Sequence, residues 1–267
     1  MIEKFKTALV QNNMAANTVT AYLYAVNDYL TKYKMINKKN LLLYKMELIE
    51  HFKPKTANLR IQALNKYLEF IGKEYLRLKS VKVQQRTYLE NVISQADYLF
   101  FKNKLKREEN KMWYFVVRFL AATGARVSEL VQFKVEHVQI GHFDIYTKCG
   151  KVRRLFVPKK LRDEAMAWFE TEGMASGYIF LNCRGDRITT RGIALQLKIL
   201  ARRHGLNPRV VYPHSFRHRY AKNFLEAYND ISLLADLMGH ESIETTRIYL
   251  RRTASEQQNI VDKVITW

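Results

Sequence analysis

Apolar residues recur at the spacing of an α-helix along most of this chain, and one stretch alternates with the period of a β-strand. In residues 17–33 the apolar side chains fall on one helical face, and the same pattern returns in residues 2–10, 40–52 and 56–75. Two alternating segments, GHFDIYTK and RRLFVP, flank the letters CGK, which predicts a β-hairpin. With 10 Gly and 4 Pro in 267 residues, the chain is poor in the turn residues that an extensive β-sheet needs. We therefore expect a mainly α-helical protein with a small β-sheet.

The helical pattern lapses between two segments of the chain. Residues 79–88 carry three basic residues and no acidic residue, and they have few apolar positions that could pack on a neighbour. We predict a helical bundle over residues 1–78, a basic linker over 79–88 and a mixed α/β domain over 89–267. Ser94 is expected to cap the first helix of this domain, and Gly124 is expected to end the second. The helices predicted in this domain span residues 95–110, 110–125, 126–134, 189–205, 215–228, 230–239 and 243–253.

The chain is strongly basic. Its 45 Lys and Arg outnumber its 25 Asp and Glu, so the net charge is +20. Such a field attracts polyanions, and we expect double-stranded DNA as the partner. The surplus is present in both predicted domains, so both could contact the phosphates of one duplex. The alternative is a cationic surface that binds no nucleic acid.

The sequence also indicates where the protein acts. The two cysteines, Cys149 and Cys183, are too few for a disulfide framework, and neither belongs to a cluster of metal ligands. The first residues lack the pattern of a secretory signal, and the most apolar run is interrupted by Arg118 and is too short to span a bilayer. We expect a cytoplasmic protein that has no metal, no cofactor and no membrane partner.

Several side chains of the second predicted domain suit phosphodiester chemistry without a metal. Such chemistry needs guanidinium groups that hold the non-bridging oxygens, a nucleophile that attacks phosphorus, and an acid that protonates the departing oxygen. Taken singly, each candidate also fits an ordinary structural role, such as a helix cap, a solvated charge or a core aromatic. The order and spacing of the candidates along the chain are what favour phosphodiester chemistry. The candidates are Arg126, Lys148, Lys151, His214, Arg217, His240 and Tyr249.

Three motifs contain most of these candidates. They are ATGARVSEL at residues 122–130, HSFRH at residues 214–218 and LMGHESIETTRIY at residues 237–249. In this order they resemble the motifs of the tyrosine recombinase (phage integrase) family, and most closely those of its Xer-type members. The resemblance covers about residues 90–250. It implies a mixed α/β tyrosine-recombinase catalytic domain that follows a helical, SAM-like core-binding domain, which the first segment matches only in general character.

The resemblance assigns the central roles to four residues. It implies that Arg126 and Arg217 clamp the scissile phosphate and that Glu129 orients Arg126. It implies that Tyr249 attacks phosphorus, which forms a 3′-phosphotyrosine and frees a 5′-hydroxyl. The covalent bond conserves the energy of the phosphodiester, so no ATP is needed.

The remaining roles fall to two histidines and a lysine of the hairpin. By the resemblance, His214 exchanges a proton with the tyrosine, and His240 donates a hydrogen bond to a phosphate oxygen. The family hairpin usually reads G-K-G-x-K-x-R-x-V-P, whereas this chain has TKCGKVRRLFVP, which is longer between the lysine and the proline. Lys148 aligns with the general acid, Lys151 is the alternative, and Cys149 stands where glycine is common.

The implied function is site-specific DNA recombination. Four protomers, a homo-tetramer, would hold two DNA sites and exchange strands in pairs through a Holliday junction. The enzyme would be associated with the nucleoid, and its task would be dimer resolution, integration or inversion. There are two alternatives. One is a type IB-like topoisomerase, which uses similar chemistry without pairing two sites, and the other is a non-catalytic DNA-binding protein of the same fold.

Eighteen residues follow Tyr249. A short helix there is marginal alone and has to bury its apolar face against something. The tail would either fold back onto its own catalytic domain or dock into a neighbouring protomer, as it does in similar recombinases. The residues of this face are Ile260, Val261, Val264, Ile265 and Trp267.

Overall fold

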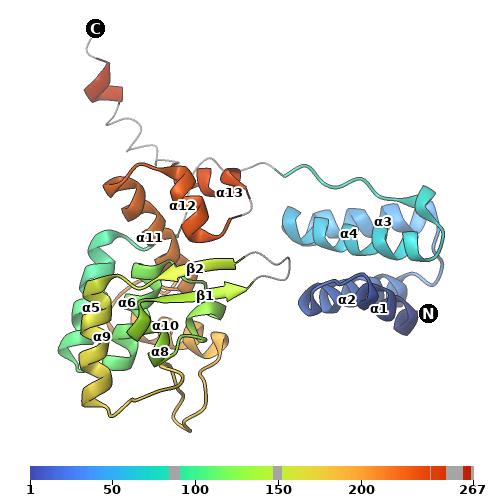
Figure 1. Ribbon diagram of the computed structural model, residues 1–267. Helices are drawn as coiled ribbons and strands as arrows, with labels where there is room; N and C mark the ends of the chain where they lie inside the picture. The colour runs from blue at the N-terminus through green and yellow to red at the C-terminus, as the bar shows by residue number, and fades with distance from the viewer. Residues whose placement is uncertain (84–90, 147–151, 241, 251–260, 266–267) are drawn as a thin grey trace. The chain divides into compact units, whose positions relative to one another are not determined.

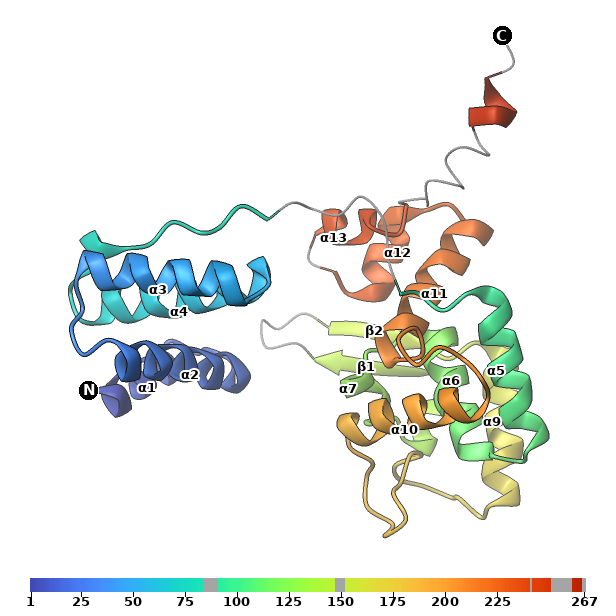
Figure 2. The same ribbon diagram turned by 180° about the vertical axis from the view of Figure 1, so that it is seen from behind.

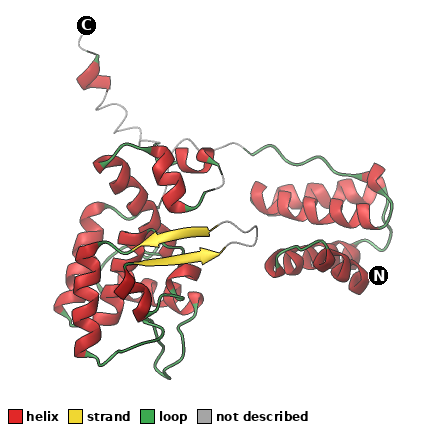
Figure 3. Ribbon diagram, in the orientation of Figure 1, coloured by secondary structure: helices red, strands yellow, loops and turns green. Residues whose placement is uncertain are grey.

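The computed structural model describes residues 1–83, 91–146, 152–240, 242–250 and 261–265 (Figure 1). The chain divides into two compact units, Met1–Gln85 and Arg86–Trp267. Most of the described residues are helical, and the sheet among them is a single pair of strands (Figure 3). The predicted fold class, mainly α with a small β-sheet, is confirmed. Part of the predicted linker, residues 84–88, lies outside the described residues.

The first unit is a helical bundle. Its helix α2 packs on α1 and on α4, and α3 packs on α4. The apolar stripes of these helices meet in one core, in which Tyr29 and Tyr44 stand edge to face. Each helix corresponds to a stretch in which the sequence predicted one. The elements are α1 (Ile2–Gln11), α2 (Ala16–Lys32), α3 (Lys38–His51), α4 (Pro54–Phe70) and the 3-10 turn η1 (Glu74–Leu76).

The second unit is built around α6 (Lys111–Thr123), which contributes several fully buried apolar side chains to its core. Helices α5, α7, α9 and α11 all pack on α6, as the view from behind also shows (Figure 2). None of the helices in the described ranges is long and apolar enough to cross a bilayer. The other elements are α5 (Gln95–Arg107), α7 (Val127–Leu130), α8 (Val135–Ile140), β1 (His142–Tyr146), β2 (Val152–Phe156), α9 (Lys159–Thr171), α10 (Thr190–Arg203), α11 (Pro213–Ala227), α12 (Ile231–Met238) and α13 (Ile243–Arg247).

Two helices, α8 and α9, were not predicted from the sequence. In α9 the buried residues Leu161, Ala165 and Trp168 share one face, so the helical period is present, but charged residues dominate the first turns. Helix α8 is six residues long, which is shorter than the window in which a period can be recognised. Helix α13 ends at Arg247, before the predicted end at residue 253, although residues 251–253 lie outside the described part of the chain.

The predicted β-hairpin is present. Its strands β1 and β2 are antiparallel, with a register that runs from the pair His142–Phe156 to the pair Tyr146–Val152. Burial alternates along β2, and one of its two buried positions is occupied by Arg153. Helix α12 packs beside β2, and α8 packs beside β1. A charged side chain therefore points from the hairpin into the interior of the second unit.

Helix ends in the second unit follow the expected capping chemistry. The hydroxyl of Ser94 accepts a hydrogen bond from the backbone N–H of Asp97 at 2.9 Å, which caps α5 as predicted. Gly124 ends α6 with φ +62°, and Gly239 ends α12 with φ +59°. Both angles lie in the left-handed region, which glycine adopts without steric cost. The chain segments that begin at these two glycines lie close together in the second unit.

Replacing Gly124 should test how tightly α11 packs on this turn. A Cβ at Gly124 would lie 2.5 Å from Cδ1 of Tyr220, whereas Gly173 has a similar φ of +65° with nothing within 4 Å of its Cβ position. Both Gly→Ala variants incur backbone strain, but Gly124→Ala should cost about 1–3 kcal/mol more, because it also overpacks the core. All three tryptophans lie in the second unit, so urea unfolding followed by tryptophan fluorescence measures the difference. An equal cost for Gly124→Ala and Gly173→Ala would contradict this packing.

Candidate active site

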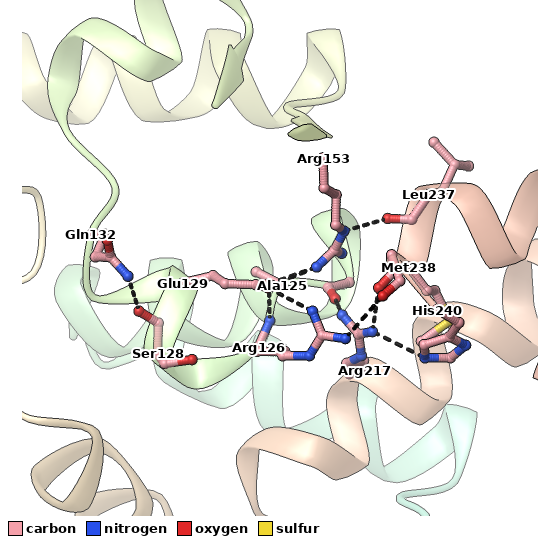
Figure 4. Close-up of polar contacts among 12 residues, drawn as sticks. Ala125, Arg126, Ser128, Glu129, Gln132, Arg153, Arg217, Leu237, Met238 and His240 are labelled. Carbon is pink, nitrogen blue, oxygen red and sulfur yellow. Dashed lines mark hydrogen bonds and ion pairs between the residues drawn. The ribbon is translucent and has the colours of Figure 1, made fainter. Parts of the chain in front are cut away.

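The end of α12 is where three arginines meet. Its last carbonyl oxygens have no partner within the helix and carry the negative end of the helix dipole. Three consecutive carbonyl oxygens accept hydrogen bonds from three different guanidinium groups (Figure 4). The arginines belong to β2, to α11 and to the start of α7. The pairs are Arg153 Nε with Leu237 O at 2.9 Å, Arg217 Nη2 with Met238 O at 2.6 Å, and Arg126 Nη2 with Gly239 O at 3.3 Å.

The carboxylate of Glu129 joins two of these arginines. Its Oε1 accepts from Nη1 of Arg126 and from Nη1 of Arg153, both at 2.8 Å. Its Oε2 accepts from the backbone N–H of Arg126 at 2.7 Å and from Nη1 of Arg153 at 2.9 Å. Burial acts to raise the pKa of Glu129, but Arg153 and Arg126 outweigh it and hold the pKa below its ordinary value. Glu129 is therefore a charged, fully hydrogen-bonded group between two guanidinium ions, as Figure 4 shows.

Arg126 and Arg217 differ in how exposed they are to solvent. The side chain of Arg126 is 37% exposed, whereas Arg217 is 2% exposed as a residue. Arg217 also donates from Nη1 to the carbonyl of Gly124 at 2.5 Å. Burial, together with the charges of Arg153 and Arg126, lowers the pKa of Arg217 to about 10. Three guanidinium groups meet here beside one carboxylate, which pairs with two of them, so the site has an excess of positive charge that favours a bound anion.

His240 directly follows the glycine that ends α12. Its Nε2 lies 3.2 Å from Nη2 of Arg217, and its Nδ1 lies 2.7 Å from the hydroxyl of Thr246. Because a guanidinium only donates, Nε2 of His240 accepts, which assigns the proton to Nδ1. Burial and the charge of Arg217 lower the pKa of His240 to about 4, so the ring is neutral at physiological pH.

Tyr249 is buried close to this group. It is 7% exposed and packs with Ala221, Leu234 and Met238, between α11 and α12. Its hydroxyl lies 3.1 Å from Nδ1 of His218, and its ring stacks over that of His240 with centroids 6.3 Å apart. Burial raises the pKa of the Tyr249 hydroxyl, and Arg217 and Arg126 oppose that rise.

The two histidines of α11 lie in different surroundings. His214 is exposed at the start of the helix, and its ring centroid is 6.2 Å from that of His218. Burial, with the nearby His214 and Arg217, lowers the pKa of His218 to about 4, so this ring is neutral and can accept the Tyr249 proton in a hydrogen bond. Burial and Arg217 also lower the pKa of His214. The role expected for His214 stays a prediction, because the histidine in contact with the tyrosine is His218.

Most of the predicted site residues come together at this point. Arg126, Glu129, Arg217 and His240 are joined by hydrogen bonds among themselves or through the end of α12, and Tyr249 lies beside His240. The candidate acids, both lysines of the hairpin tip, lie outside the described residues. Where the chain is described, no group of three or more His, Cys, Asp or Glu side chains could hold a metal ion.

Sequence reasoning missed three residues of the site, namely Arg153, His218 and Thr246. His218 and Thr246 stand inside the quoted motifs, but nothing in the motifs says that one contacts the tyrosine hydroxyl and the other His240. The sequence indicated the position of Arg153 only weakly. Arg153 stands two residues before Leu155 in its strand, and side chains two apart point to the same face.

Comparisons with known proteins agree with this arrangement. The profile of the phage integrase family matches residues 91–256. The tyrosine recombinase XerA of Thermococcus kodakarensis is 29% identical over 280 residues, which cover 99% of this chain and 97% of that protein. The tyrosine recombinase XerA of Pyrococcus furiosus is 27% identical, with 98% and 93% covered. The XerH site-specific recombinase, solved in a pre-cleavage complex with its difH substrate, has a similar fold at a TM-score of 0.71 and 17% identity, over 94% of this chain and 80% of that one.

The lowered pKa of His218 predicts how stability depends on pH. An unfolded histidine has a pKa of about 6.5, so between that value and about 4 the unfolded chain binds the proton and the folded chain does not. The contribution of His218 to the free energy of unfolding is complete above pH 6.5. It is lost as the pH falls toward 4, by at most about 1.4 kcal/mol per pH unit.

Urea unfolding of the second unit, followed by tryptophan fluorescence between pH 7 and pH 5, measures this slope. His218→Asn should make the slope shallower than in the unmodified protein. His51→Asn, at an exposed position of α3 in the other unit, is the control and should leave the slope unchanged. Identical slopes for His218→Asn and the unmodified protein would show that His218 is not held neutral in the fold.

Proposed function

The chain belongs to the phage integrase family, and we propose that it acts as a tyrosine site-specific recombinase that cuts and rejoins duplex DNA. The observation that carries the proposal is the group at the end of α12, where Arg126 and Arg217 converge beside the buried Tyr249. The XerA relatives are named as tyrosine recombinases, and they match this chain over almost its whole length.

The arginines supply the electrostatic part of the reaction. A phosphodiester that enters the site would find Arg126, whose open side can bind one non-bridging oxygen, and Arg217, whose charge is little screened because it is buried. Both groups are fixed by hydrogen bonds before the substrate arrives, so they need little reorganisation as charge grows on the phosphate oxygens. Binding an anion would also relieve the repulsion among the three guanidinium groups of the site.

Tyr249 is the proposed nucleophile. Its hydroxyl oxygen would bond to phosphorus while the bond from phosphorus to the 5′ oxygen breaks, which leaves a 3′-phosphotyrosine and a 5′-hydroxyl. The tyrosine proton would pass to a histidine. The family motif assigns this step to His214, and the contact at 3.1 Å makes His218 the nearer acceptor. The leaving oxygen would take its proton from Lys148, with Lys151 as the alternative. No cofactor or metal enters this scheme.

His240 would hold a phosphate oxygen. Its Nε2 accepts from Arg217, so it can donate to a phosphate only after its proton moves from Nδ1 to Nε2 or after a second proton binds. A phosphate that takes over the donor of Arg217 would free Nε2 for this exchange. Substrate binding and the tautomer of His240 are therefore linked.

The DNA and the assembly complete the proposal. The helical bundle of residues 1–78 would be a DNA-binding, core-binding domain, the basic linker over 79–88 would join it to the catalytic domain over 89–267, and the enzyme would work in the cytoplasm at the nucleoid. Four protomers would hold two DNA sites and exchange strands through a Holliday junction. The tail supports contacts between protomers, because Val261, Val264 and Ile265 are 50%, 58% and 47% exposed. Apolar side chains that their own chain leaves open are available to a neighbour.

Tyr249→Phe should separate a recombinase from a non-catalytic DNA-binding protein. The variant keeps the ring and loses only the hydroxyl, so it should bind DNA like the unmodified protein and form no covalent adduct. The adduct is measured on a denaturing gel after incubation with a nicked duplex that carries the recombination site. Tyr228→Phe, at an exposed tyrosine just after α11, is the matched control and should form the adduct normally. An adduct with Tyr249→Phe would show that the nucleophile is another residue, and plasmid relaxation without a specific site would favour a topoisomerase.

Truncation after Thr253 should separate docking in trans from packing in cis. If the tail docks into a neighbour, the free energy of unfolding of the isolated monomer should change by no more than about 0.5 kcal/mol, the size expected of a surface change. Cooperative binding to a two-site duplex and cleavage should then both be lost. The double variant Val261→Asp with Val264→Asp should behave in the same way, and Lys263→Ala is the control on the same segment. A truncated monomer that is less stable by several kcal/mol would mean that the tail packs on its own domain.

A further inference from the structure

One of the three arginines at the end of α12 stands outside the proposed phosphate clamp. Arg153 extends inward from β2 and is 6% exposed, whereas the side chain of Arg126 is 37% exposed. It lies in the hairpin segment TKCGKVRRLFVP, and the family resemblance gives it no role in the reaction. Its guanidinium is nevertheless bound to the same helix end and to the same carboxylate as Arg126.

The contacts of Arg153 join three elements. Its Nη1 donates to both oxygens of Glu129 in α7, at 2.8 and 2.9 Å, and its Nε donates to the carbonyl of Leu237 at 2.9 Å (Figure 4). One rigid, planar group therefore spans β2, α7 and the end of α12. A lysine offers a single flexible ammonium, which could hold one of these partners and could not fix the angle between them.

Arg153 also determines the shape of the turn after α12. A Cβ at Gly239 would lie 2.3 Å from Cδ of Arg153, so the arginine stem passes where any other residue would place its side chain. The turn that carries His240 is consequently packed directly on the stem of Arg153. A shift of this stem would move the carbonyl of Gly239, which accepts a hydrogen bond from Arg126.

The position of Arg153 is not one that stability alone would favour. Its Nη2 is buried and has no hydrogen-bond partner, and burial lowers its pKa even though Glu129 and its hydrogen bond act to raise it. Well-packed apolar side chains often replace a buried ion pair without loss of stability. An apolar residue could not hold a carboxylate and a carbonyl in fixed relation, and this is the property that the neighbouring phosphate site needs.

We propose that Arg153 is a positioning residue of the recombination site, which fixes Glu129 and the end of α12 relative to each other and thereby sets Arg126 for the phosphate. This inference rests on the proposed recombinase function. It concerns cleavage and not affinity, because the guanidinium of Arg153 donates to Glu129 and to the carbonyl of Leu237 and would make no contact with the DNA. Its effect passes through Arg126, so the two arginines should not act independently.

The test is a double-mutant cycle on the rate of single-turnover cleavage, measured as covalent adduct on a nicked duplex. Arg153→Lys should lower this rate by about 100-fold, which is the effect of a misplacement of about 1 Å in a catalytic group, and should leave DNA binding unchanged. In a protein that already carries Arg126→Ala, adding Arg153→Lys should lower the rate by less than about threefold, because the residue that Arg153 positions is gone. Arg154→Lys is the control, since Arg154 is the next residue of β2, points outward and pairs with Asp144.

Each other outcome decides against the proposal. If the reductions in cleavage rate caused by Arg126→Ala and Arg153→Lys multiply in the double variant, Arg153 acts separately from Arg126. Cleavage by Arg153→Lys at the normal rate would mean that its geometry is not needed. If Arg153→Lys and Arg153→Gln both fail to fold, as seen by tryptophan fluorescence, the residue is structural and the proposal is wrong. If the unmodified protein forms no adduct, the proposed function itself fails, and this result is distinct from the others.

Discussion

The unpaired carbonyl oxygens at the end of α12 are the constraint on which the catalytic unit depends. A helix that ends inside a protein has to satisfy these groups, and here three guanidinium ions do so. The arginines come from a strand and from two other helices, so the helix end ties β2, α7 and α11 together. Gly239 makes this possible, because its left-handed backbone turns the chain away and its missing side chain leaves room for an arginine stem. The same contacts that complete the helix also bring together the residues of the proposed phosphate site.

The excess positive charge of the proposed site would be balanced by a bound anion. Glu129 neutralises one of the three arginines, and the nearby histidines, His218 and His240, are held neutral by burial. Neutral histidines can accept or relay a proton, which protonated ones cannot do as readily. Burial raises the pKa of Tyr249, and in the proposed reaction its hydroxyl would lose the proton only with a base and a phosphate in place. Cleavage would thus depend on the substrate to complete the electrostatics of the site.

Much of the fold could be predicted from the sequence. Periodicity indicated all helices of the first unit and most of those in the second, and the change to period two located the hairpin. Capping chemistry located Ser94 and Gly124 correctly at the ends of α5 and α6. Helix α9 was missed because its charged first turns obscure the apolar face, and α8 because six residues are too few to show a period. Local patterns therefore worked wherever an element was long enough to display its own buried face.

The sequence by itself determined which chemical groups are available and in what order, since the motifs around Arg126, Arg217, His240 and Tyr249 can be read without coordinates. It could not determine which of these groups touch, because residues 126, 153 and 239 are far apart along the chain. Only the tertiary structure decided that Arg153 lies beneath Gly239 and shares Glu129 with Arg126. The physical reason is that a hydrogen bond between distant segments depends on how whole helices and strands pack, and no local propensity encodes that packing.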